Sequence, residues 1–141
     1  MSDAAQAAAP RSGARVNGTI IRIFSELPER AVTFPVILML TTVPDADTAD
    51  KLASAALAAR VAACVTQLGS VHSQYHWKGT VEAADEIQLL FKTSAARAAE
   101  LERFIETHHP YETPELLSWQ VSASASYGQW VNAETQRPVH V

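Results

Sequence analysis

Residues 62–93 read AACVTQLGSVHSQYHWKGTVEAADEIQLLFKT, and this stretch decides the fold. Side-chain character alternates along both halves, which is the period of two expected for half-buried strands. Lys78 and Gly79 separate the halves and predict a tight turn. Gly69 predicts a bulge or bend in the first arm. The stretch therefore predicts a hairpin with arms too long for one small domain, so we expect its tip to reach another subunit.

A strand and a helix are predicted before this hairpin. Residues 35–43, PVILMLTTV, form a β-rich run too apolar to face water on either side, which is typical of a central strand. Residues 45–61 carry small and apolar side chains at steps of three and four, which predicts a helix with Asp45 as a candidate N-cap. The predicted stripe consists of Ala49, Leu52, Ala53, Ala56, Leu57 and Arg60.

A second helix and a fourth strand are predicted after the hairpin. Thr93 or Ser94 is the expected cap of the helix, and Pro110 stops it. Its apolar stripe consists of Ala98, Leu101, Phe104, Ile105 and His108. Residues 114–121, PELLSWQV, then predict a strand, and residues 127–135 predict a short terminal helix or turn.

The resulting order, β-α-β-β-α-β, predicts an α+β fold of the ferredoxin-like kind. Such a fold has an antiparallel sheet with both helices on one face. The opposite face would carry Tyr75 and Trp77 and would be bare in a monomer. Exposed aromatic surface of this kind normally marks an interface, so we expect an oligomer.

Length and composition place limits on the rest of the chain. We interpret residues 34–141 as one domain and residues 1–33 as a weakly ordered extension with a short strand at Thr19–Phe24. The net charge of −4 argues against nucleic-acid binding, and a single cysteine excludes an intrachain disulfide. Apolar runs are too short to span a bilayer, and no secretory leader is recognised, so we expect a cytoplasmic protein.

Four blocks of this sequence resemble the CutA family of divalent-cation-tolerance proteins. They are TTVPDADTADKLA, LAARVAACVTQLGSVHSQYHWKGTVE, EIQLLFKT and HHPYETPELL. The resemblance covers residues 36–131 and implies a ferredoxin-like homotrimer linked to copper and other divalent metal ions. Some family members carry a cysteine where this chain has Thr41, so one possible soft ligand is absent here.

Four residues are the candidate metal ligands. They are Cys64, His108, His109 and Glu112. Thiolate and imidazole suit copper, but the spacing of these residues shows no closed ligand cluster. A site would therefore be assembled from separate segments or subunits. The alternatives are that Cys64 packs as a small buried hydrophobe and that His108 packs at a helix end.

The loop THHPYETPELL, residues 107–117, is the second candidate feature, because two prolines stiffen a segment that carries a phenol, a carboxylate and imidazoles. It is either a ligand-binding cleft between subunits or a structural polar network. The residues expected in that cleft are Tyr75, Trp77, Lys92, Tyr111 and Trp130. The alternative function is a PII-like signalling or scaffold trimer that binds a small anionic metabolite or a partner protein there. No nucleophile with oxyanion donors is recognised, so we do not expect an enzyme.

Overall fold

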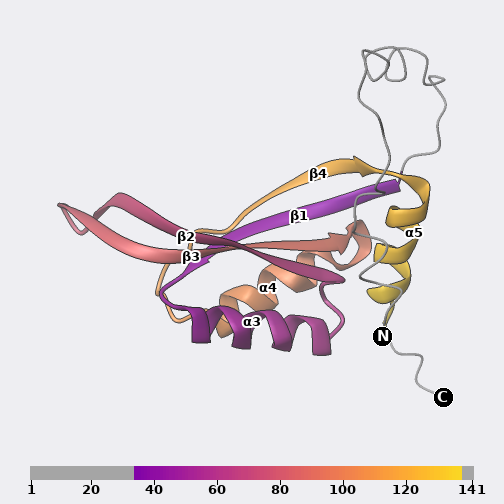
Figure 1. The fold of residues 1–141 in the computed structure, drawn as a ribbon, viewed down its shortest axis with the longest axis horizontal. Coiled ribbons are helices and arrows are strands. Elements are labelled where there is room, and N and C mark those ends of the chain that lie inside the picture. The colour runs from indigo at the N-terminus through magenta and orange to yellow at the C-terminus, as the bar shows by residue number, and fades with distance from the viewer. Residues whose placement is uncertain (1–33, 138–141) are drawn as a thin grey trace, which may run out of the picture. The chain divides into compact units, whose positions relative to one another are not determined.

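β1 (Phe34–Val43) is an inner strand of a four-stranded sheet, as the apolar run at residues 36–40 predicts. The computed structural model describes residues 34–137, so the predicted N-terminal extension and its strand at Thr19–Phe24 lie outside the described residues. The other elements are α3 (Ala46–Ala58), β2 (Cys64–Trp77), β3 (Thr80–Ser94), α4 (Ala98–His108), β4 (Leu117–Ala123) and α5 (Ala125–Glu134) (Figure 1).

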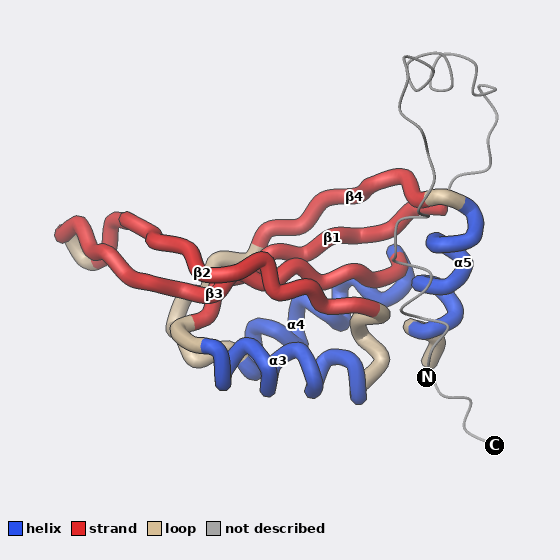
Figure 2. The backbone as a smooth tube through the Cα atoms, viewed as in Figure 1, coloured by secondary structure: helices blue, strands red, loops and turns tan. Residues whose placement is uncertain are grey.

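The sheet has the order β2-β3-β1-β4, and every neighbouring pair is antiparallel. α3 and α4 lie together on one face of it (Figure 2). Met39, Leu89 and Phe91 on this face pack with Leu101 and Ile105 of α4 into the main core. The predicted ferredoxin-like α+β fold is therefore confirmed. Between residues 34 and 137, no helix is long and apolar enough to cross a membrane.

α3 begins where the sequence predicts, and it ends earlier. The Asp45 carboxylate accepts a hydrogen bond from the Thr48 N–H at 2.8 Å, which caps the helix. The helix ends at Ala58 and not at residue 61, because Arg60 turns into the left-handed region with a φ of 56°. The predicted buried position of Leu57 was wrong, since its side chain is 42% exposed.

The predicted cap of the second helix was also wrong. A 3₁₀ turn (Ala95–Arg97) precedes α4, and the Ser94 side chain caps neither element. Ser94 Oγ instead accepts a hydrogen bond from Thr135 Oγ1 at 2.8 Å, while the Thr93 hydroxyl donates to the Val61 carbonyl. These hydroxyls therefore join distant segments rather than starting a helix.

The β2–β3 hairpin has the predicted turn and the predicted bulge. Lys78 and Gly79 have φ of 49° and 83°, which is the double positive φ of a type I′ turn. The pairing register shifts between Gln67 and Gly69, and Gly69 has a φ of 113°. Pairing of β3 with β1 ends at Ile87, so the distal arms pair only with each other and project beyond the sheet (Figure 1).

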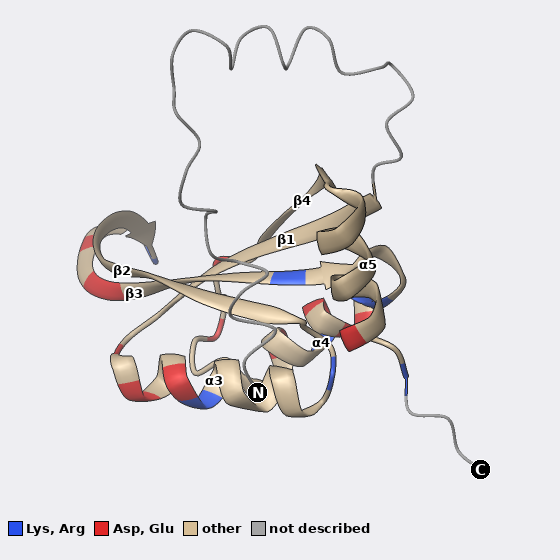
Figure 3. Ribbon diagram, turned by 45° about the vertical axis from the view of Figure 1, so that its right-hand side comes forward, with Lys and Arg blue, Asp and Glu red and all other residues tan. Residues whose placement is uncertain are grey.

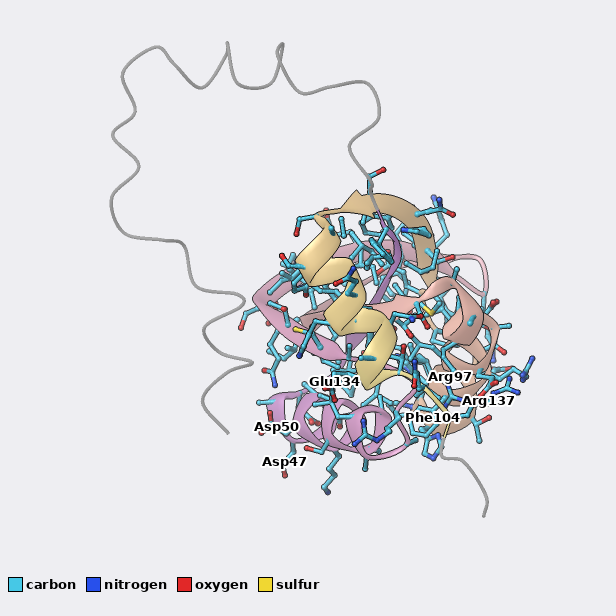
Figure 4. All side chains as sticks on the ribbon, turned by 90° about the vertical axis from the view of Figure 1, so that its right-hand side faces the viewer. Asp47, Asp50, Arg97, Phe104, Glu134 and Arg137 are labelled. Carbon is cyan, nitrogen blue, oxygen red and sulfur yellow. The ribbon has the colours of Figure 1, made fainter. Side chains whose placement is uncertain are left out.

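α5 packs at the other end of the sheet, where Gly128 lies against Phe34 of β1. Arg97 and Arg137 both bind Glu100 near this end, and Figure 4 shows the two arginines close together. Among residues 34–137, no other helix covers the sheet face opposite α3 and α4. Leu117 and Trp119 there are 53% and 43% exposed.

Candidate functional site

His109 fastens the loop between α4 and β4 to the end of β1. Its side chain is buried, and its Nδ1 accepts a hydrogen bond from the Tyr111 N–H at 3.1 Å. The ring proton is therefore assigned to Nε2, which donates to the Thr42 carbonyl at 2.9 Å and lies 3.1 Å from Thr41 Oγ1. Burial lowers the pKa of His109 and outweighs the opposing effects of Thr42 and the Glu86 charge. The imidazole is held neutral inside the fold.

Thr41 secures the other end of the same loop. Its hydroxyl is fully buried and donates to the Glu115 carbonyl at 2.7 Å. Both ends of the loop are thus joined to neighbouring residues of β1, and Pro110 and Pro114 restrict the backbone between them. The loop is a rigid wall, which is the property that a preformed site needs.

The carboxylate of Glu86 joins this wall to the hairpin. Glu86 is only 7% exposed, and its Oε1 accepts a hydrogen bond from the Tyr111 hydroxyl at 3.0 Å. The Ser73 hydroxyl donates to the other oxygen at 2.7 Å. Burial and the neighbouring carboxylate raise the pKa of Tyr111 well above its usual value, so the phenol stays protonated and remains a donor.

An open cleft of about 840 Å³ lies between the loop and the hairpin. Its walls are residues 110–115 of the loop and residues 73–77 of β2, with Thr42 and Glu86 completing the lining. Tyr75, Trp77 and Tyr111 contribute phenol and indole rings to the lining, and His76 contributes an imidazole. Glu86, Glu112 and Glu115 give the lining negative charge, and no Lys or Arg is found among the described residues that line it.

Comparisons with known proteins identify the family. The profile of the CutA1 divalent ion tolerance protein matches residues 37–134. The divalent-cation tolerance protein CutA of Yersinia pestis (strain Pestoides F) is 43% identical over 98 residues, which are 69% of this chain and 82% of that protein. The chain belongs to the CutA1 family.

Solved CutA structures share its fold. The crystal structure of CutA from Xylella fastidiosa is 38% identical with a TM-score of 0.69, covering 72% of this chain and 98% of that chain. CutA from Synechococcus elongatus PCC7942 is 33% identical with a TM-score of 0.68, covering 72% of this chain and 91% of that chain. The resemblance seen in the sequence is therefore confirmed.

This CutA1 chain brings together some of the predicted cleft residues and separates others. Tyr75, Trp77 and Tyr111 line one cleft within a single chain, and Glu112 lies beside them. Within residues 34–137, neither Lys92 nor Trp130 lines this cleft. They belong to a second cluster around Cys64. Lys92 Nζ lies 3.8 Å from Cys64 Sγ, and Trp130 packs against Tyr127, whose phenol is near Cys64.

The predicted metal ligands do not form one site within this CutA1 chain. Cys64 is at the start of β2, where it pairs with Lys92, whereas His109 and Glu112 are in the loop beyond α4. Both ring nitrogens of His109 are occupied by hydrogen bonds. The His108 ring stacks on the Phe104 ring, with 4.0 Å between the ring centroids. Across residues 34–137, no group of three His, Cys, Asp or Glu side chains could hold a metal ion. The donors of one chain therefore do not fit a closed metal site.

Glu86 is the residue that sequence reasoning missed. It stands in the strand pattern between Asp85 and Ile87, where a carboxylate looks like an ordinary solvent-facing residue. Its partner Tyr111 is 25 residues away along the chain. Only the packing of the loop against β3 reveals that this carboxylate is buried.

Proposed function

We propose that this CutA1 family member is a homotrimer that contributes to tolerance of divalent cations in the cytoplasm, binding copper or related ions without catalysing a reaction. The supporting observation is the family match over residues 37–134, to which the 43% identical Yersinia protein adds the name of a divalent-cation tolerance protein. The exposed Leu117 and Trp119 support assembly, because apolar side chains on an uncovered sheet face are typical of interfaces.

In this proposal a metal ion is bound where two copies meet. Three candidate ligands remain reachable from solvent in the single chain: the Cys64 thiol is partly exposed, and Glu112 and His108 are exposed. Cys64 lies in β2, His108 in α4 and Glu112 in the loop after α4, so a single chain supplies only one of these ligands at each place. Assembly around a symmetry axis supplies further ligands from a second copy. Thiolate would favour Cu(I), while imidazole and carboxylate accept Cu²⁺ or Zn²⁺.

Calorimetric titration of the purified assembly with Cu²⁺ and Zn²⁺ tests this function. We expect saturable binding to the wild type and at least tenfold weaker binding, about 1.4 kcal/mol, for Cys64→Ser or Glu112→Gln if that residue is a ligand. His72→Ala is the matched control, because His72 is an exposed histidine held by Asp85 on the hairpin. The absence of saturable binding to the wild type would refute metal binding by this protein.

A PII-like role remains the second proposed function, and the cleft of about 840 Å³ favours small-molecule binding of some kind. The negative charge of Glu86, Glu112 and Glu115 in its lining does not suit the small anionic metabolite named in that alternative. A thermal-shift screen with nucleotides and organic acids tests this version, because a ligand at 100 times its Kd stabilises a protein by about 2.7 kcal/mol. Destabilisation or no change with every anion would reject it.

A further inference from the structure

Glu86 is a buried carboxylate at the cleft, and its polar partners within residues 34–137 carry no positive charge. Both of its hydrogen-bond donors, the Tyr111 and Ser73 hydroxyls, are neutral. Among residues 34–137, no salt bridge includes Glu86. Neutral donors offset only part of the cost of burying a carboxylate, so a positive charge in the cleft would be stabilised.

The other walls of the cleft favour an organic cation over a bare metal ion. Tyr75 and Trp77 line the cleft, and phenol and indole rings are the groups with which ammonium and guanidinium ions make cation–π contacts. Glu112 and Glu115 add negative charge, and both oxygens of Glu86 already accept hydrogen bonds. Figure 3 shows further acidic positions along the distal part of the hairpin.

Lys78 already places an ammonium group at the entrance of this cleft. Its Nζ lies 4.0 Å from Glu112 Oε2 and 5.5 Å from the centroid of the Trp77 ring. Both side chains of this ion pair are about three-quarters exposed, at 73% and 75%, so the contact is weak and exchangeable. The chain therefore provides its own example of an alkylammonium between a carboxylate and an indole.

We infer that the cleft binds a small organic cation with a primary ammonium group, and that Lys78 competes with it from the hairpin tip. The ammonium is attracted by Glu86 and Glu112, and the alkyl part packs against the rings of Tyr75 and Trp77. This inference shares Glu112 with the proposed metal role, but it uses neither Cys64 nor an inter-subunit ligand set, and Glu86, Tyr75 and Trp77 belong to it alone.

NMR titration of the ¹⁵N-labelled full-length protein tests the inference with n-butylammonium chloride as the probe. The indole N–H of Trp77, assigned with a Trp77→Phe variant, should shift saturably, while those of Trp119 and Trp130 should move less. In Lys78→Met the apparent Kd should fall about 2- to 5-fold, because the internal competitor is gone. Glu112→Gln in the Lys78→Met background should reverse that gain.

Matched controls separate this inference from simpler effects. 1-Butanol has the same alkyl chain without the charge, and MgCl₂ at equal ionic strength supplies charge without the alkyl group. Equal shifts from either compound, or no saturable shift in both the wild type and Lys78→Met, would overturn the inference. A folded Glu86→Gln variant that binds the probe as tightly as wild type would overturn the role of the buried carboxylate. The metal titration reads out separately, so failure of one proposal leaves the other intact.

Discussion

His109 has the chemistry of a metal ligand and the environment of a structural side chain. Its residue type and its place outside the apolar stripe of α4 favoured a ligand role in the sequence. In the structure it connects the loop to Thr42 and Tyr111, which uses both ring nitrogens. At the scale of single residues, burial and hydrogen-bond partners decide what a histidine can do, and neither is visible in a residue type.

The lowered pKa of His109 predicts how stability depends on pH. The unfolded chain binds a proton near the usual pKa of 6.5, whereas the folded protein resists protonation, so stability is complete above that value. The free energy of unfolding should therefore decrease as pH falls below about 6.5. Urea unfolding between about pH 5.5 and 7.5 measures this slope. His109→Gln should flatten the slope, and the exposed His76→Ala should keep it.

The phenol of Tyr111 gives a second residue-scale prediction. Tyr111→Phe removes a hydrogen bond to the buried Glu86 carboxylate, which should lower the free energy of unfolding by about 1–3 kcal/mol. Urea unfolding at fixed protein concentration measures the change. Tyr75→Phe is the control. Tyr75 is 42% exposed, so removing its hydroxyl should change the free energy of unfolding little. Equal stability of the two variants would contradict the described role of Tyr111.

At the scale of elements, one turn and one bulge position the whole β2–β3 hairpin. The turn at Lys78 and Gly79 sets the hairpin register, and the bulge near Gly69 adds a residue on β2. The distal arms therefore present Ser73, Tyr75 and Trp77 toward the loop after α4. The cleft is a product of two elements that no local sequence pattern connects.

The packing of α5 on β1 predicts the effect of a single methyl group. A Cβ at residue 128 would lie 2.1 Å from Phe34 Cβ, so Gly128→Ala forces the helix and the strand apart. We expect a loss of about 1–3 kcal/mol in the free energy of unfolding, with exposed Ser126→Ala on the same helix as the control. Thermal unfolding measures both variants, and unchanged stability of Gly128→Ala would contradict this packing.

At the scale of the whole molecule, the proposed assembly uses the sheet face opposite α3 and α4. The sequence placed Tyr75 and Trp77 between chains, whereas in the structure they line a cleft within one chain, and their part in assembly stays a prediction. Leu117 and Trp119 are exposed apolar residues of β4, the edge strand that pairs with β1. We therefore expect the proposed trimer to depend on them.

A charge on this face should prevent assembly without unfolding the chain. Leu117→Asp should cost about 2–4 kcal/mol of association free energy per copy, because it buries an unpaired carboxylate at the interface. Light scattering at micromolar protein should show a reduced mass. Leu57→Asp is the matched control, since Leu57 is 42% exposed on α3, which covers the opposite face. An unchanged mass for Leu117→Asp would place the interface elsewhere.

The sequence by itself determined the element order, the hairpin turn, the bulge and the family, because periodicity and turn chemistry are local properties of the chain. It also predicted a cleft between subunits at the loop around Tyr111, and three of the residues predicted there, Tyr75, Trp77 and Tyr111, line a cleft within the single chain. Only the tertiary structure decided that His109 is internal, that Glu86 is buried, and that Lys92 and Trp130 belong to another cluster. The physical reason is that burial and charge pairing depend on contacts between segments far apart in the chain, which no local pattern records.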